Sequence, residues 1–135
     1  MGDYLPIKVI IDTNFLFIPT RFNVDILKEL ERVTGTTVEP TLLSPVYEEI
    51  KTISTKAGKL GRLAVTALKY AERLKRVEIE SETNETVDDI IFRVAADWSC
   101  PVATNDRVLR KRLRDAGLIV IYLRQSSHLE IYGQI

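Results

Sequence analysis

Ile7-Lys8-Val9-Ile10-Ile11 is a short, β-branched run that ends at Asp12. Its composition suits a strand that is buried on both faces of a sheet. A second short run, Pro101-Val102-Ala103-Thr104-Asn105, ends at Asp106. If the two runs are adjacent parallel strands, both aspartates emerge at the same edge of the sheet, where α/β proteins place their sites. The two runs therefore predict an α/β fold with an acidic edge.

Segments with apolar residues at helical spacing separate the strand-like runs. Strands separated by helices imply parallel pairing through right-handed crossovers. We therefore expect a three-layer α/β/α sandwich around a central, mainly parallel, five-stranded sheet. Asn23 is the expected N-cap of the first helix, with Asp25 in its first turn. The expected strands cover residues 7–11, 41–43, 77–80, 101–104 and 118–123, and the expected helices cover residues 22–33, 44–53, 58–74, 87–98 and 107–116.

The length of 135 residues indicates one domain, residues 1–135, in which residues 124–135 form either an edge strand or a docking arm. Basic and acidic residues both number 19, so bulk charge does not indicate a nucleic-acid partner. A single cysteine, Cys100, excludes an internal disulfide and a multi-cysteine zinc site. No signal peptide is visible, and no apolar stretch approaches the ~20 residues that span a membrane. A cytoplasmic protein is the simplest interpretation.

Four carboxylates, Asp12, Glu49, Asp88 and Asp106, lie at or just beyond the ends of expected elements, and Asp89 adjoins one of them. Carboxylates that cluster repel one another strongly unless a cation lies among their oxygens. The pattern predicts a divalent-metal site, and such sites most often serve phosphate chemistry.

Each acidic motif also has a purely structural interpretation. Asp, Thr and Asn directly after a strand make turns and helix caps, and Asp88 and Asp89 would suit the first turn of a helix. Glu49 shares the inward face of its helix with Val46, whereas Glu48 falls nearer the outside. Structural capping does not require residues from such distant parts of the chain to converge, so the set favours a site.

A basic run directly follows Asp106, and its structural interpretation is a solvated helix face. Its functional interpretation is a wall that binds phosphates beside the acidic centre. The only histidine, His128, lies in the tail and is not expected to be a catalytic base. The expected phosphate-binding residues are Arg107, Arg110, Lys111 and Arg114.

Four stretches resemble the PIN-domain family of metal-dependent ribonucleases in their order and spacing. They are Ile10-Ile11-Asp12-Thr13-Asn14, Ser44-Pro45-Val46-Tyr47-Glu48-Glu49-Ile50, Asp88-Asp89-Ile90-Ile91 and Val102-Ala103-Thr104-Asn105-Asp106-Arg107-Val108-Leu109. The resemblance implies that the catalytic and metal-binding quartet is Asp12, Glu49, Asp88 and Asp106, that Asp89 could replace or join Asp88 as a ligand, and that the flanking polar residues are Thr13, Asn14, Thr104 and Asn105.

The resemblance also implies an activity, namely hydrolysis of single-stranded RNA with one or two Mg²⁺ or Mn²⁺ ions. Within the family, the chain looks most like the archaeal and eukaryotic Fcf/Utp-type proteins of small-subunit rRNA processing. The expected partners are then RNA, in particular pre-rRNA, a second copy of the chain, and a ribosome-assembly protein. VapC-type toxins, which pair with an antitoxin, are a second possibility, and a non-catalytic RNA- or protein-binding scaffold in a preribosomal particle is a third.

Overall fold

The computed structural model describes residues 5–133 and 135, and it has the expected α/β fold. Strands and helices alternate along most of the chain, as the periodicity predicted. The strands are β1 (Ile7–Ile11), β2 (Val38–Leu43), β3 (Lys75–Val77), β4 (Val102–Ala103), β5 (Val120–Arg124) and β6 (His128–Tyr132). The helices are the 3-10 helix η1 (Thr13–Phe17) and α1 (Ile18–Phe22), α2 (Ile26–Thr34), α3 (Ser44–Ser54), α4 (Lys59–Ala71), α5 (Val87–Trp98) and α6 (Arg107–Asp115).

The sheet has six strands in the order β3-β2-β1-β4-β5-β6, one more than the five expected. Strands β1 to β5 pair in parallel, and β6 pairs antiparallel with β5. The additional strand comes from the tail, so of its two predicted structures the edge strand is the one that forms. The strand order reverses between β1 and β4, which makes this point the topological switch point of the sheet.

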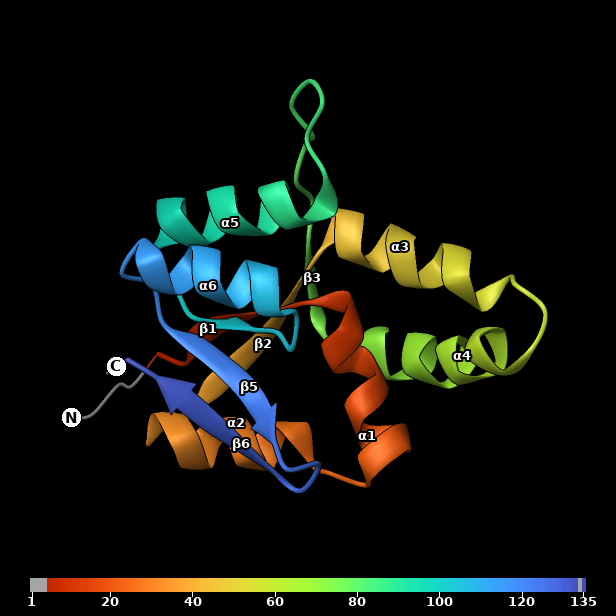
Figure 1. Cartoon of the computed structure of the whole chain (residues 1–135), viewed down its shortest axis with the longest axis horizontal. Helices are drawn as coiled ribbons and strands as arrows, with labels where there is room; N and C mark the ends of the chain where they lie inside the picture. Colours follow the sequence, from red (N-terminus) through yellow and green to blue (C-terminus); the bar gives the residue numbers. More distant parts are fainter. Residues whose placement is uncertain (1–4, 134) are drawn as a thin grey trace.

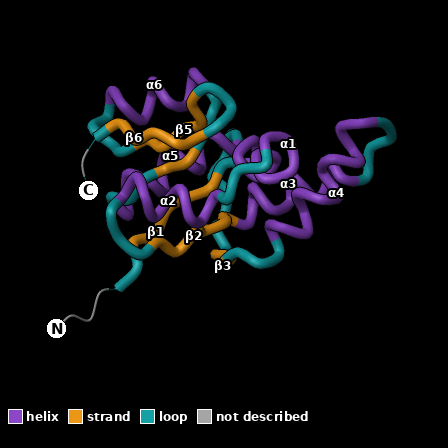
Figure 2. Tube along the Cα trace, turned by 90° about the horizontal axis from the view of Figure 1, so that it is seen from below, coloured by secondary structure: helices purple, strands orange, loops and turns teal. Residues whose placement is uncertain are grey.

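Helices cover the sheet on both sides. Helices α5 and α6 lie on one side and α2 lies on the other, while α3 and α4 form a helical hairpin that extends beyond the strands (Figure 1; Figure 2). The central strand β1 is correspondingly apolar, and Val9, Ile10 and Ile11 are at most 1% exposed. Burial on both faces explains why this strand is continuously β-branched rather than alternating.

Two expected elements differ in detail. Asn23 is not an N-cap: it has a left-handed backbone (φ 53°) and ends α1. The N-cap of α2 is instead Asp25, whose side chain accepts a hydrogen bond of 3.1 Å from the backbone N–H of Lys28. The helix expected over residues 22–33 therefore begins only at Ile26, and Phe22 ends the separate short helix α1. Strand β3 also ends early, because the backbone N–H of Ile79 donates to Ser44 Oγ (2.9 Å) instead of continuing the sheet.

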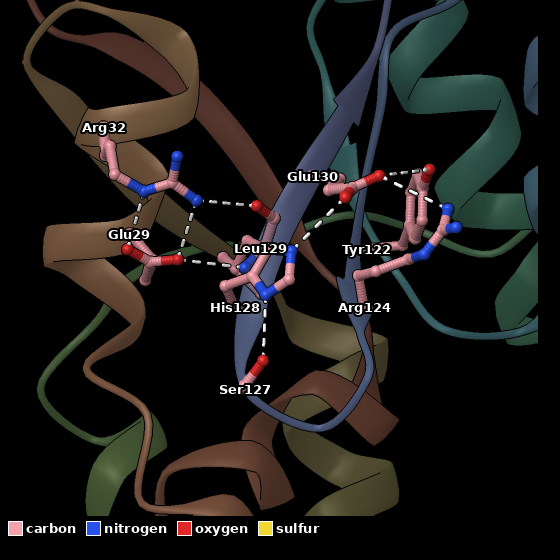
Figure 3. A network of polar contacts seen from close by, with 8 residues as sticks. All are labelled: Glu29, Arg32, Tyr122, Arg124, Ser127, His128, Leu129 and Glu130. Carbon is pink, nitrogen blue, oxygen red and sulfur yellow. Dashed lines mark hydrogen bonds and ion pairs between the residues drawn. The ribbon is translucent and has the colours of Figure 1, made fainter.

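Two side chains of α2 bind the outer backbone edge of β6, where a further strand would otherwise pair (Figure 3). The backbone N–H of Leu129 donates to Glu29 Oε1 at 2.9 Å, and its carbonyl accepts from Arg32 Nη2 at 2.8 Å. Arg32 also donates to both carboxylate oxygens of Glu29, so the pair acts as one unit. These contacts satisfy backbone groups that an open edge would leave free for pairing with other chains.

Within the described residues, none of the helices combines the length and the apolar character that crossing a membrane requires.

Candidate metal centre

The acidic edge lies at the switch point between β1 and β4. The two strands pair in parallel, with Ile11 opposite Ala103. The backbone N–H of Asp12 continues the ladder by donating to the carbonyl of Ala103 (3.0 Å). Asp12 and Thr104 consequently leave the sheet side by side, at the position where open α/β sheets form their binding crevice. The adjacency expected from the two sequence runs is thus present.

Asp12 is held in one orientation by three hydrogen-bond donors. Its carboxylate accepts from the backbone N–H of Thr13 (2.7 Å), from Thr104 Oγ1 (2.6 Å) and from Asn14 Nδ2 (3.1 Å). The side chain is only 4% exposed. Burial raises the pKa of Asp12 above its ordinary value, and the neighbouring carboxylates Glu49 and Asp106 raise it further against the lowering effect of the donors.

Asp106 combines capping with a place beside Asp12. As the N-cap of α6, its Oδ1 accepts from the backbone N–H of Leu109 (2.9 Å). Its own backbone N–H donates to Thr104 Oγ1 (3.1 Å), and that hydroxyl in turn donates to Asp12. The capping interpretation of this motif is therefore correct, and so is the convergence: Thr104 connects the two aspartates.

Glu49 reaches the same site from α3. Its Oε1 accepts a short hydrogen bond from Thr13 Oγ1, on the segment that follows β1. Glu49 is half-buried and Glu48 is exposed, as the helical spacing from Val46 predicted.

Asp88 and Asp89, adjacent at the start of α5, have different surroundings. Burial raises the pKa of Asp88 to about 6, and the charges of Asp12, Asp106 and Glu49 contribute to the increase. Asp89 instead completes a capping box with Thr86 and forms an ion pair with Arg112 at 2.7 Å. These contacts lower the pKa of Asp89. Of the two residues, Asp88 therefore belongs electrostatically to the carboxylate cluster.

Two asparagines connect the loops around the cluster. The backbone N–H of Asn105 donates to Asn14 Oδ1 (3.1 Å), which joins the segments after β1 and β4. The side chain of Asn105 accepts from the backbone N–H of Leu123 (2.8 Å), so β5 is tied to the same edge. The sequence identified both asparagines as neighbours of the site, but their partners depend on the folded structure.

The donor set matches a hard divalent cation. Four carboxylates supply only oxygen ligands, which Mg²⁺ and Mn²⁺ prefer, and their mutual repulsion contributes to the raised pKa values of Asp12 and Asp88. In the part of the chain that the structure describes, no three His, Cys, Asp or Glu side chains are arranged as a ready cation cage. Asp12, Asp106 and Glu49 each accept hydrogen bonds from protein groups, which fixes the present side-chain orientations.

The basic face predicted on α6 borders a cavity of about 420 Å³ beside the acidic edge. The opposite wall is formed by the β5–β6 hairpin, which the sequence did not connect with the site. Sequence motifs do not mark Tyr122 in β5 or Tyr132 in β6, so the sequence does not identify these two residues. The cavity is lined by Arg107, Arg110, Lys111, Arg114, Val120, Tyr122, Arg124 and Tyr132.

Comparison with known proteins gives one consistent result. A family model described as "PIN like domain" matches residues 9–126. The chain is 27% identical to ribonuclease VapC4 of Methanocaldococcus jannaschii, over 95% of this chain and 98% of that protein. It is 31% identical to the rRNA-processing protein FCF1 of Saccharomyces cerevisiae, over 81% of this chain and 55% of that protein. The solved structure of the PIN domain endonuclease Utp24 superposes with a TM-score of 0.78 at 25% identity, covering 96% of both chains.

Proposed function

This chain belongs to the PIN-domain family, and from that membership we propose that it is an endoribonuclease that hydrolyses single-stranded RNA with a divalent metal ion. The observation that carries the proposal is the convergence of Asp12, Glu49, Asp88 and Asp106 at the switch point of the sheet. A scaffold protein has no need for four carboxylates whose mutual repulsion opposes their ionisation. Nuclease activity also agrees with the relatives, since VapC4 is a ribonuclease and Utp24 is an endonuclease.

The four carboxylates would hold Mg²⁺ or Mn²⁺. The chemistry supplied by such a cation is Lewis-acid stabilisation of the charge that develops on the phosphodiester, together with activation of water for the attack. Asp89 is a less suitable ligand than Asp88, because Thr86 and Arg112 already bind its carboxylate.

The surrounding residues orient this set and position the RNA. Thr104 holds Asp12 at a fixed distance from Asp106, and Thr13 holds Glu49 near the same segment. Preorganised ligands of this kind avoid reorganisation during the reaction. The cationic residues of α6 contact phosphates and so position the strand without selecting its sequence.

We propose rRNA processing as the biological role, because the relative FCF1 is an rRNA-processing protein and the chain has the fold of the PIN domain endonuclease Utp24. Pre-rRNA and a ribosome-assembly protein are then the proposed partners. A toxin ribonuclease paired with an antitoxin is the second candidate, because the match to VapC4 extends over 98% of that protein. Growth arrest on expression, relieved by the product of a neighbouring gene, would identify the toxin.

The activity is tested by incubating a labelled single-stranded RNA with the purified chain in Mg²⁺, Mn²⁺ or EDTA. We expect cleavage in the presence of metal and no cleavage in EDTA. The Asp12→Asn variant should lose cleavage, while its circular dichroism spectrum should show that the fold is retained. Glu48→Gln is the matched control, because it removes an exposed carboxylate from the same helix as Glu49. Metal-dependent cleavage that persists in Asp12→Asn contradicts the proposed centre, and absence of cleavage in every condition favours the scaffold.

A further inference from the structure

We propose that the cavity between α6 and the β5–β6 hairpin is a nucleotide-binding subsite, in which an unpaired base of the RNA stacks on tyrosine while the adjoining phosphates bind arginine. The inference rests on the proposed function for the identity of the ligand as RNA. It extends that function by assigning a path to the strand beyond the scissile phosphate and by adding the hairpin as a binding element.

One wall of the cavity is a single helical face. Arg107, Arg110, Lys111 and Arg114 follow the i, i+3, i+4, i+7 pattern of one side of a helix. Their backbone positions span about 10 Å at the ordinary rise of a helix. The hairpin adds a fifth cation, Arg124, and among the described residues that line the cavity there is no carboxylate. The cavity therefore suits an extended anion.

Most of this positive charge is not neutralised by the protein. Lys111 pairs with Asp115 at 2.7 Å and Arg124 pairs with Glu130 at 3.5 Å, but both pairs are exposed and easily exchanged for other anions. The remaining three arginines of the cavity form no ion pair among residues 5–133 and 135. One of them, Arg110, also has a buried Nε–H with no acceptor in that part of the chain, so the described residues do not use its full hydrogen-bonding capacity.

The other wall supplies aromatic rings that suit bases rather than phosphates. The guanidinium of Arg110 lies 4.7 Å from the ring centre of Tyr122, and that of Arg114 lies 5.3 Å from the ring centre of Tyr132. Tyr132 is 52% exposed despite this contact, so part of the ring is available for stacking. Alternating aromatic rings and cations form the usual binding platform for single-stranded nucleic acid.

One end of the cavity is formed by residues that adjoin the acidic edge in the chain. Arg107 directly follows Asp106, and Arg124 directly follows Leu123, whose N–H donates to Asn105 Oδ1 at 2.8 Å. From there the cavity extends along α6 toward the last turn of that helix. An RNA strand with its phosphodiester at the carboxylates would thus place flanking nucleotides in the cavity. Only unpaired bases can stack on the rings, so the subsite also selects single strands.

The test measures RNA binding without cleavage. The affinity of the full chain for a short labelled oligouridylate is determined by fluorescence anisotropy in EDTA at several salt concentrations. We expect Tyr132→Ala to weaken binding about tenfold and Tyr132→Phe to leave it nearly unchanged, because the ring and not its hydroxyl provides the stacking surface. Arg114→Gln should lower the salt slope by ~0.7, the change for one lost phosphate contact. Arg73→Gln is the control for bulk charge. Arg73 is exposed and precedes β3, which lies at the opposite edge of the sheet from β6.

The outcomes separate this inference from the proposed activity. If Tyr132→Ala binds like the wild type while Arg114→Gln does not, the stacking subsite is wrong and the cavity holds phosphates alone. If neither variant differs from Arg73→Gln, the whole subsite is wrong, although metal-dependent cleavage can still stand. If the variants lose RNA binding in a chain that never cleaves, the subsite stands and the proposed activity fails. Displacement of RNA from the wild type by poly-glutamate at equal concentration would identify an acidic protein as the ligand instead.

Discussion

Asp88 and Asp89 are neighbours with opposite electrostatic surroundings. The pKa of Asp88 is raised to about 6 by burial and by the neighbouring carboxylates, whereas the pKa of Asp89 is lowered by Thr86 and Arg112. The family resemblance favours Asp88 in the quartet but leaves Asp89 open as a ligand, because both lie in the first turn of the same helix. The folded structure separates them because one faces the cluster and the other faces α6.

This difference predicts opposite effects of the same substitution. Because the pKa of Asp88 is higher in the folded than in the unfolded chain, ionised Asp88 destabilises the metal-free fold above about pH 6, and this effect disappears as the pH falls below about 4. Asp88→Asn should therefore raise the free energy of unfolding by ~1 kcal/mol at about pH 7, a value reduced for solvent screening, and not at about pH 4. Asp89→Asn should lower it at about pH 7, because it removes a cap and an ion pair. Urea unfolding in EDTA measures both, and destabilisation by Asp88→Asn at neutral pH would contradict the interpretation.

Thr104 predicts a second residue-scale effect, because its hydroxyl is fully buried and connects Asp12 with the backbone of Asp106. Thr104→Val keeps the shape of the side chain but removes that connection. We expect cleavage to fall by roughly ten- to a hundredfold, as for other groups that orient metal ligands, and the metal concentration at half-maximal activity to rise. Thr104→Ser retains the hydroxyl and should restore most of the activity. If Thr104→Val and Thr104→Ser cleave RNA at the same rate, the hydrogen bonds of the hydroxyl do not contribute to activity.

At the scale of elements, regular spacing predicted most of the structure. Strand β1 and helix α5 have the expected bounds, because a continuous buried run and an amphipathic segment with a Thr cap are local signals. The apolar spacing predicts a helix from residue 22 because it continues across Asn23, but the left-handed backbone of Asn23 ends α1 before α2 begins at Ile26. The sequence does not decide between an edge strand and a docking arm for residues 124–135, because the anchors of β6, Glu29 and Arg32, are about a hundred residues away in the chain.

The anchor of β6 predicts how the hairpin responds to substitution and to pH. Glu29 has its pKa lowered to about 2, chiefly by Arg32. A lowered pKa means that the stabilisation is present above the unfolded value, near 4.5, and is lost as the pH falls toward 2. Glu29→Gln should speed hydrogen exchange of the Leu129 N–H at neutral pH, whereas Glu72→Gln, on an exposed part of the chain after α4, should not. Unchanged exchange at Leu129 would show that pairing with β5 alone holds the strand.

At the scale of the molecule, the site is assembled from four segments that meet only because the strand order reverses between β1 and β4. The sequence could predict the acidic set, since strand ends and motif order are visible in it. It could not predict the aromatic wall of the neighbouring cavity, since that wall depends on the position of the tail. The proposed metal centre therefore depends on the parallel strands of the sheet, whereas the proposed subsite depends on the antiparallel β5–β6 hairpin at its edge.

A final prediction concerns the whole fold, because ligands that bind only the folded chain stabilise it. A cation that binds between Asp12 and Asp88 would also relieve the repulsion that raises their pKa values. With Mn²⁺ at a hundred times its dissociation constant, the stabilisation is about 2.7 kcal/mol, which raises the Tm by roughly 5–10 °C for a chain of this size. Calorimetry in Mn²⁺ and EDTA should show this rise for the wild type and for Glu48→Gln, and little of it for Asp12→Asn. An equal rise in Asp12→Asn would place the stabilising ion elsewhere on the molecule, whatever the outcome of the cleavage assay.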